Sequence, residues 1–333
     1  MSLHPQPVEG TVKGDLARYP APAEPVVRLR ALRSVSLRST AVDECVDFYS
    51  EAWGLRPTER DRDAAWLRGT GAEHHILQLV GADESGLDKI AFAVATPREI
   101  DEAAHRLRLL TIPLITEPGP LDQVGGGYGL RFLDPEGRLI ELSCDTYSVT
   151  PDDPDGLPAV PRKLAHVVLN TVDIDAACAF YTAVLGMRIS DWSEHQMAFL
   201  RCNADHHVIA FNQAEWSSIN HVAYEMPSID HFMRGIGRLR HNGVTPLWGP
   251  GRHGPGNNTF GYFADPAGLV CEYTSEVEQV EEDAWLCRVW RRVPELSDLW
   301  GTAGPPSKDV RRHMAGVPDL GHLSRAGNTG VPS

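Results

Sequence analysis

The stretch AHVVLNTVDIDAACAFYTAVLGMRI, residues 165–189, decides the fold because a related stretch stands 132 residues earlier in the chain. It begins with the alternation of a strand and continues with helical apolar spacing that ends at a glycine turn. The earlier stretch, RSVSLRSTAVDECVDFYSEAWGLRP, residues 33–57, has the same order of features. The chain is therefore expected to contain a repeated unit.

Three further landmarks occur twice, in the same order. LRGTGAEHHILQLV (67–80) matches LRCNADHHVIAFN (200–212), and GLRFLDPEGRLIELSC (129–144) matches GYFADPAGLVCEYTS (261–275). Between them, residues 88–115 match 220–247. The sequence therefore predicts two copies of one unit of about 130 residues.

Each copy reads twice as a strand, a helix and three short strands. The predicted fold is α+β, with four βαβββ modules. We expect an N-terminal arm (1–27), a first copy (28–150), a Pro/Asp-rich linker (151–161), a second copy (162–280) and a tail outside the repeat (281–333).

Composition narrows the range of functions. A formal charge of −14 would repel a phosphate backbone, so we expect no nucleic-acid partner. The six cysteines form no CxxC pair, which indicates reduced thiols in a cytoplasmic protein. A start without an apolar signal segment and the lack of any run of about 18 apolar residues predict neither secretion nor a membrane partner.

The repeat provides an internal control, because ligand-capable residues can be compared between the copies. Three positions carry the comparison: His166 against Ser34, His221 against Lys89, and Glu272 against Glu141. Two imidazoles and a carboxylate form the facial triad that suits a non-haem ferrous ion with open positions. The second copy is therefore the predicted metal-binding copy, with zinc, manganese, nickel and cobalt left open by ligand type.

The segment GPGRHGPGNNTFGYFADPAGLVCEY (249–273) carries a family resemblance. It contains Gly-x-His ending at His253, a tyrosine at Tyr262, then Asp-Pro-x-Gly and Glu272. With His166 and His221, this pattern resembles the type I extradiol ring-cleavage dioxygenases of the vicinal oxygen chelate superfamily, over residues 28–276. Gly261 departs from it, since the family usually has an aliphatic residue there, and this puts the shape of the pocket in question.

The resemblance implies two tandem vicinal-oxygen-chelate domains, each a curved mixed sheet that encloses a funnel. It implies that His166, His221 and Glu272 bind Fe(II), with Mn(II) as an alternative. His207 would be the acid–base residue, while His253 and Tyr262 would bind the substrate oxygens.

The implied reaction inserts both atoms of O2 into a catechol-type substrate and cleaves the ring next to the diol. Two alternatives remain: a metal-dependent isomerase or transferase like the glyoxalases, and a non-catalytic small-molecule-binding protein. The resemblance also implies a homo-oligomer, a tetramer or larger.

Several other residues allow both a functional and a structural interpretation. Candidates for the substrate pocket are Trp248, Phe199, Asn258 and Arg292. Trp248 could instead fill the core, and Arg292 belongs to a tail that is either a lid or a subunit contact. The doublet His206–His207 has a counterpart in the first copy, so it could serve the fold, and strand alternation would point His206 away from His207.

Overall fold

The computed structural model describes residues 24–153, 158–282, 284–319 and 321–322. Most of the predicted arm (1–23) and part of the predicted linker (154–157) lie outside the described residues. Within the described ranges, no helix has the length and apolar character needed to cross a membrane.

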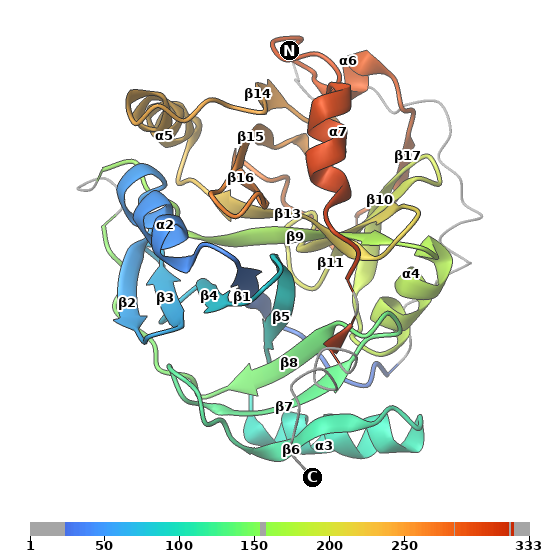
Figure 1. Cartoon of the computed structure of the whole chain (residues 1–333). Coiled ribbons are helices and arrows are strands. Elements are labelled where there is room, and N and C mark those ends of the chain that lie inside the picture. Colours follow the sequence, from blue (N-terminus) through green and yellow to red (C-terminus); the bar gives the residue numbers. More distant parts are fainter. Residues whose placement is uncertain (1–23, 154–157, 283, 320, 323–333) are drawn as a thin grey trace.

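Two mixed sheets form the body of the protein (Figure 1). The strands of the first sheet are β1 (Ala31–Ser39), β2 (Arg56–Arg60), β3 (Ala64–Arg68), β4 (Leu77–Gly81), β5 (Gly86–Ala93), β6 (Leu114–Pro120), β7 (Tyr128–Leu133) and β8 (Leu139–Cys144). The strands of the second are β9 (Lys163–Thr171), β10 (Arg188–Ser193), β11 (Met197–Arg201), β12 (Ile209–Gln213), β13 (Ser218–Glu225), β14 (Trp248–Arg252), β15 (Thr259–Ala264), β16 (Val270–Ser275) and β17 (Arg288–Trp290).

The helices connect the first strand of each module to the next three. They are α2 (Val42–Asp47), continued by a π-helical turn (Phe48–Ala52), α3 (Pro97–Leu109), α4 (Ile174–Ala183) and α5 (Ile229–His241). The tail adds α6 (Pro294–Ser297) and α7 (Lys308–Ala315), and a 3-10 turn (Pro255–Asn257) precedes β15. Each βαβββ module is therefore present as predicted.

The two sheets have the same strand order. The first runs β2-β3-β4-β1-β5-β8-β7-β6, and the second runs β17-β10-β11-β12-β9-β13-β16-β15-β14. Both orders place the first strands of the two modules side by side and antiparallel. The repeat in the sequence is thus a repeat in topology, and β17 from the tail is an addition beyond β10.

Local sequence explains where the helices begin and end. The side chain of Asp173 accepts a hydrogen bond from the backbone N–H of Ala176 and caps α4, and Ser228 caps α5 through His231. Gly186 follows α4 with a φ of 64°, a left-handed conformation that glycine adopts without steric cost. The capping side chains thus fix where α4 and α5 begin, and the glycine turn lets the chain leave α4.

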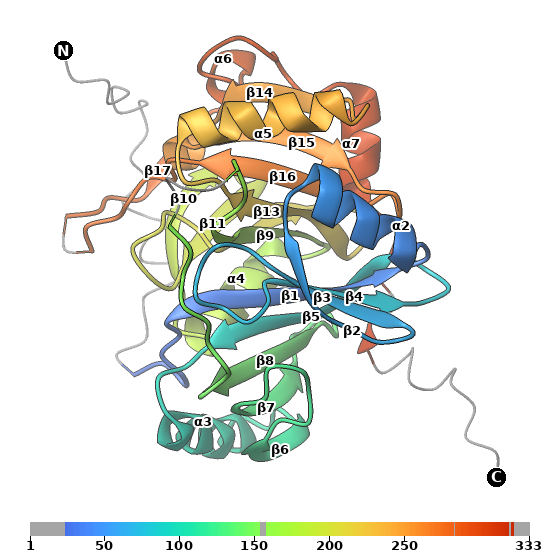
Figure 2. The same cartoon turned by 90° about the vertical axis from the view of Figure 1, so that its left-hand side faces the viewer.

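The two copies pack together through large side chains. Trp53 of the first copy stacks on Tyr273 of the second, with ring centroids 3.8 Å apart. Arg238 on α5 donates hydrogen bonds to the carbonyls of Ala52 and Trp53, across from its own copy. A single hydrophobic cluster includes residues from both copies. Figure 2 shows the two sheets one above the other, with β9 of the second sheet next to β1 of the first.

Candidate metal centre

Three adjacent strands of the second sheet carry the predicted ligands. His166 lies on β9, His221 on β13 and Glu272 on β16, and the strand order places β13 between the other two. His166 and Glu272 both pair with Ala223 across the sheet, and His221 precedes Ala223 by two residues. Because paired residues and residues two apart share a face, all three side chains project from the same face.

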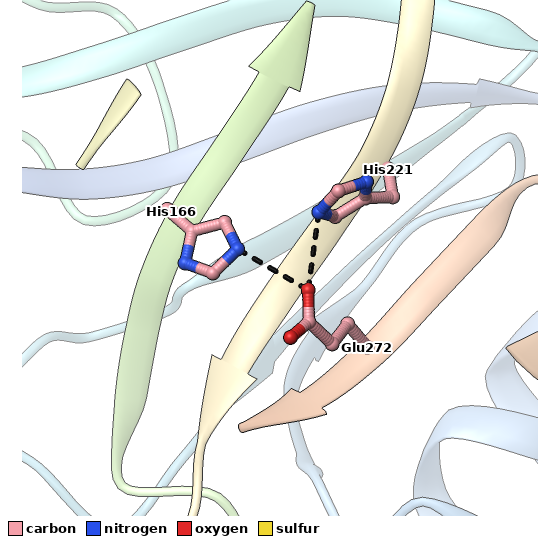
Figure 3. Close-up of side chains that lie close together, drawn as sticks. All are labelled: His166, His221 and Glu272. Atoms are coloured by element: carbon pink, nitrogen blue, oxygen red, sulfur yellow. Dashed lines mark hydrogen bonds and ion pairs between the residues drawn. The ribbon is translucent and has the colours of Figure 1, made fainter. Parts of the chain in front are cut away.

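The three side chains converge on one point (Figure 3). His166 Nε2 lies 3.2 Å and His221 Nε2 lies 3.1 Å from the same oxygen of Glu272. All three residues are at most 5% exposed. One ligand atom from each can be chosen so that all lie within 4.8 Å of one another. The strands therefore assemble the group that the sequence comparison predicted.

The polar atoms of this group fit a divalent cation. Among the described residues, His166 Nδ1, His221 Nε2 and Glu272 Oε1 have no hydrogen-bond partner although they are buried. Buried polar atoms without partners are rare because burial costs free energy. A cation held by His166 Nε2, His221 Nε2 and the carboxylate would supply the interactions that His221 and Glu272 lack.

The pKa shifts of these residues also favour a bound cation. Burial alone would raise the pKa of the Glu272 carboxyl, but His166 and His221 outweigh it and lower this pKa below its usual range. Burial lowers the pKa of His221, which favours its neutral form, the form that binds metals. A metal ion would bring a positive charge to this buried carboxylate.

Tyr262 and His253 lie together beside this group. Tyr262 pairs with Glu272 across β15 and β16. Its hydroxyl is 2.9 Å from His253 Nε2, and His253 Nδ1 donates to the carbonyl of Ser297 at 3.0 Å. With its proton on Nδ1, His253 accepts from the tyrosine. Trp248 stacks on Tyr262 at 5.2 Å, so it forms part of the wall.

Burial sets the charge of this pair. It lowers the pKa of His253 to about 4 and raises that of the Tyr262 hydroxyl well above its usual value. Both groups are therefore neutral near pH 7 and interact with a ligand by hydrogen bonding.

His207 lies against His166 of the metal group. Its ring centroid is 4.3 Å from that of His166 and 5.2 Å from that of Phe199. Burial lowers its pKa well below the usual value, so the ring is neutral. The expectation that His206 points away is wrong: the two Nδ1 atoms are 3.0 Å apart. The doublet precedes β12, which begins at Ile209, so strand alternation does not apply.

The two remaining candidates for the substrate pocket, Asn258 and Arg292, differ in their surroundings. Asn258 is buried and donates to Thr274 Oγ1 at 2.8 Å, while its Oδ1 has no partner among the described residues. Arg292 is exposed in part, and its bonds run to Ser193 and Glu194 at the end of β10. A role for Arg292 in substrate binding therefore stays a prediction.

Gly261 faces away from this site. A Cβ atom added there would meet Ile236 and Phe232 of α5, at 3.3 and 3.6 Å. The departure of Gly261 from the family pattern thus affects packing beneath the helix, and it leaves the pocket wall at Tyr262 unchanged.

Comparison with known proteins decides the family. The profile described as Glyoxalase/Bleomycin resistance protein/Dioxygenase superfamily matches residues 31–142 and 163–273. The chain belongs to this superfamily. The two matched segments coincide with the two copies and end near the last strand of each.

Individual relatives of this superfamily cover most of the chain. Metapyrocatechase 2 of Cupriavidus necator is 30% identical over 72% of this chain and 83% of its own length. A manganese-dependent 2,3-dihydroxybiphenyl 1,2-dioxygenase of Geobacillus genomosp. 3 is 24% identical over 70% of this chain and 80% of its own length. The Mn(II)-bound glyoxalase structure from Novosphingobium aromaticivorans is 40% identical, with a TM-score of 0.80, over 85% of this chain and 94% of its own.

In the first copy, ion pairs to Glu141 occupy the place that the metal group has in the second. Lys89 occupies the position of His221, and its Nζ lies 2.7 Å from Glu141. Arg131 occupies the position of Tyr262 and also contacts Glu141, at 2.8 Å. The ammonium and guanidinium groups supply the positive charge that Glu272 lacks within the described residues.

The comparison of the two copies did not identify the residues that hold the metal ligands in place. Asn220 Oδ1 accepts from His221 Nδ1 at 2.8 Å, which turns Nε2 of His221 toward Glu272. Asn220 in turn donates to Asn170. Asn220 could have been found from the sequence, because it directly precedes a predicted ligand. Nothing comparable in the sequence marks Asp191, which lies beside His206.

Proposed function

We propose that this protein is a non-haem metal-dependent extradiol dioxygenase that opens a catechol-type ring next to the diol with both atoms of O2. The observation that carries the proposal is a buried convergence of two imidazoles and a carboxylate on one face of the second sheet. Beside it lie a neutral histidine, His207, and the hydrogen-bonded pair His253 and Tyr262. This combination provides a metal, an acid–base group and substrate-binding donors.

Relatives support the proposal and the choice of metal. Metapyrocatechase 2 and a 2,3-dihydroxybiphenyl dioxygenase are named for such reactions, and the latter is described as manganese-dependent. The donor set of two histidines and one carboxylate suits Fe(II). We propose Fe(II) as the ion, with Mn(II) as the alternative.

His166, His221 and Glu272 would hold the ion. When bound, it supplies open coordination positions for the diol and for dioxygen and favours loss of a diol proton. Tyr262 and His253 would orient the substrate oxygens by hydrogen bonds. His207 would accept a proton at Nε2 and return it as the ring opens. Trp248 and Phe199 would face the ring and exclude water.

Metal-loaded protein offers the direct test. Anaerobic protein is loaded with Fe(II) or Mn(II), then given O2 and a panel of vicinal diols. We expect one O2 consumed per diol and a coloured ring-opened product. His166→Ala should lose bound metal and product formation, whereas Ser34→Ala, at the matching position of the first copy, should keep both. Metal binding without O2 consumption on any diol would contradict the proposal.

One observation favours a second candidate. The 40% identical structure from Novosphingobium aromaticivorans carries the name glyoxalase, which denotes chemistry without dioxygen. Turnover of a thiol adduct or an isomerisation in an O2-free cell would identify that activity. The dioxygenase is preferred because His207, His253 and Tyr262 provide the proton-transfer and hydrogen-bonding groups that ring cleavage needs.

We also propose a cytoplasmic homo-oligomer, a tetramer or larger. All six cysteines are free, which fits a reducing compartment. Leu286 and Trp300 of the tail are 67% and 41% exposed, which fits a subunit contact rather than a free surface. Light scattering on the purified protein tests the oligomer, and a monomer would overturn it.

A further inference from the structure

His206 lies between His207 and a buried carboxylate. Its Nδ1 is 3.0 Å from His207 Nδ1, and its Nε2 is 3.1 Å from Asp191 Oδ2. His206 and Asp191 are both 0% exposed. A continuous row therefore runs Asp191, His206, His207, and ends beside the metal group.

We propose that Asp191 and His206 are positioning residues that fix the tautomer of His207, with its proton on Nδ1 and a bare Nε2 toward the metal group. The role assigned to that Nε2 rests on the proposed dioxygenase function. His206 contacts His207 and Asp191, and its ring also lies beside that of Phe199, with centroids 5.8 Å apart.

The direction of the hydrogen bond between His206 and His207 follows from the carboxylate of Asp191, which faces His206 Nε2 at 3.1 Å without a well-aligned hydrogen bond. Asp191 already accepts from Trp290 Nε1 at 2.6 Å and from Arg288 Nε at 3.1 Å. A carboxylate in this setting can only accept, and a bare imidazole nitrogen beside it would be repelled. The carboxylate 3.1 Å away therefore favours a proton on His206 Nε2. In the proposed row the Nδ1 of His206 accepts, so that His207 Nδ1 donates and His207 Nε2 is bare.

The tail completes this arrangement. Arg288 and Trp290 belong to β17, which pairs in parallel with β10, the strand that carries Asp191. The backbone N–H of Arg288 also donates to Asp191, at 2.9 Å. Trp290 is 1% exposed, so its donor cannot be replaced by solvent. The tail thus acts on the site through Asp191.

The first copy contains the same doublet without this support. His74 Nδ1 and His75 Nδ1 are 3.1 Å apart, which repeats the geometry of the second copy. The residue at the position of Asp191 is Glu59, which is exposed, and no strand pairs beyond β2 within the described residues. The doublet alone belongs to the fold, whereas the buried carboxylate and the tail strand belong only to the copy with the metal group.

Nitrogen NMR on the metal-free protein tests the tautomer directly. Histidine is labelled with ¹⁵N, and the signals of His207 are assigned by their loss in His207→Asn. The wild type should show a protonated Nδ1 and a bare Nε2 in His207. His206→Leu should shift both signals toward averaged values. The same shifts for His207 in wild type and His206→Leu would overturn the proposal.

Kinetics provides the second readout. General acid–base catalysis contributes on the order of 10²–10⁴-fold. His206→Leu should therefore lower kcat by about tenfold or more, while KM for the diol changes less than about twofold because the substrate contacts remain. His74→Leu is the matched control in the first copy and should change neither value. An unchanged kcat in folded His206→Leu would overturn the proposal.

A milder variant guards against loss of folding. Trp290→Phe keeps the buried ring and removes only one donor to Asp191, so its melting temperature should stay near that of the wild type. The His207 signals and kcat should change in the same direction as in His206→Leu, but to a smaller extent. If neither changes, the tail does not act on His207 through Asp191.

The NMR result requires neither metal nor substrate. If no diol is opened but the signals shift, the proposed function fails and the positioning role stands. If diols are opened and the signals do not shift, the positioning role fails alone.

Discussion

Lys89 Nζ lies 2.7 Å from Glu141 Oε2 at the place in the first copy where His221 faces Glu272 in the second. Burial lowers the pKa of Lys89, and Lys89 with Arg131 brings the pKa of Glu141 below its usual value against the effect of burial. Both copies therefore place positive charge beside a buried glutamate. The first copy uses Lys89 and Arg131, and the second would use the proposed metal ion.

Lys89→Met is expected to destabilise the protein because it leaves Glu141 with one cation fewer. The free energy of unfolding should fall by about 2–3 kcal/mol, below the usual cost of an unpaired buried charge because Arg131 remains. Urea unfolding measures it. Arg60→Met, which breaks an exposed pair with Asp43, should cost at most about 1 kcal/mol. Equal effects of both substitutions would contradict this account.

Ala223→Val is expected to block metal binding. Ala223 lies between His166 and Glu272 on the ligand face, so added methyl groups would enter the space where the three side chains meet. Metal content after dialysis measures the effect. Ala91→Val is the matched control, because Ala91 lies between Ser34 and Glu141 in the first copy. It should lower stability similarly and leave metal content unchanged; full metal content in Ala223→Val would refute the prediction.

Tyr262→Phe should keep the metal and lower kcat, because only the hydroxyl that meets His253 is removed. Loss of one well-placed donor costs on the order of 10²-fold in kcat. Steady-state kinetics with a metal assay separates the two properties. Tyr224→Phe, a substitution in the shared core, serves as the control and should keep kcat. A kcat for Tyr262→Phe like that of the wild type would exclude contact with the reacting oxygens.

Stability of the metal-free protein should decrease as the pH falls from about 7 to 4. The histidine pKa is 6.5 in the unfolded chain, while burial lowers that of His75 to about 3 and that of His253 to about 4. In the interval between, the unfolded chain binds more protons, so acid favours unfolding. Urea midpoints at pH 7 and pH 5 with a chelator measure this. His75→Gln should make the dependence shallower, and an unaltered slope would contradict it.

Arg292→Ala should raise KM for diols that carry a carboxylate and leave KM for uncharged diols unchanged. Arg292 lies near the end of β10, and the substitution removes the cation that would pair with the carboxylate of the substrate. Burial lowers the pKa of this guanidinium. Steady-state kinetics on one acidic and one neutral diol compares them. An equal rise for both substrates would indicate that Arg292 supports the tail through Ser193 and Glu194 instead.

The sequence was sufficient for the features that repeat. Matched landmarks predicted the βαβββ modules, and both sheets have the same order. The differences between the copies identified His166 and His221, and the strands bring them together with Glu272, which both copies share as a glutamate. The family pattern also included Tyr262, which lies opposite Glu272 on the neighbouring strand.

The features outside the repeat could not be predicted in this way. β17 has only three residues and no counterpart in the first copy, so neither periodicity nor comparison reveals that it joins the sheet. Its contact with Asp191 bridges about 100 residues of chain, and the order of residues does not encode such pairs. His206 was misjudged because strand alternation was extended to residues that precede the strand.

The pairing of β17 with β10 also bears on the behaviour of the protein at high concentration. An uncovered outer strand offers its backbone amides and carbonyls to any other extended chain, and so promotes aggregation. In the first sheet the corresponding outer strand, β2, contains Pro57 and the charged Arg56, Glu59 and Arg60, which discourage such pairing. β10 has no proline, and β17 covers it instead. A chain shortened before residue 285 would therefore lose solubility along with the support of Asp191.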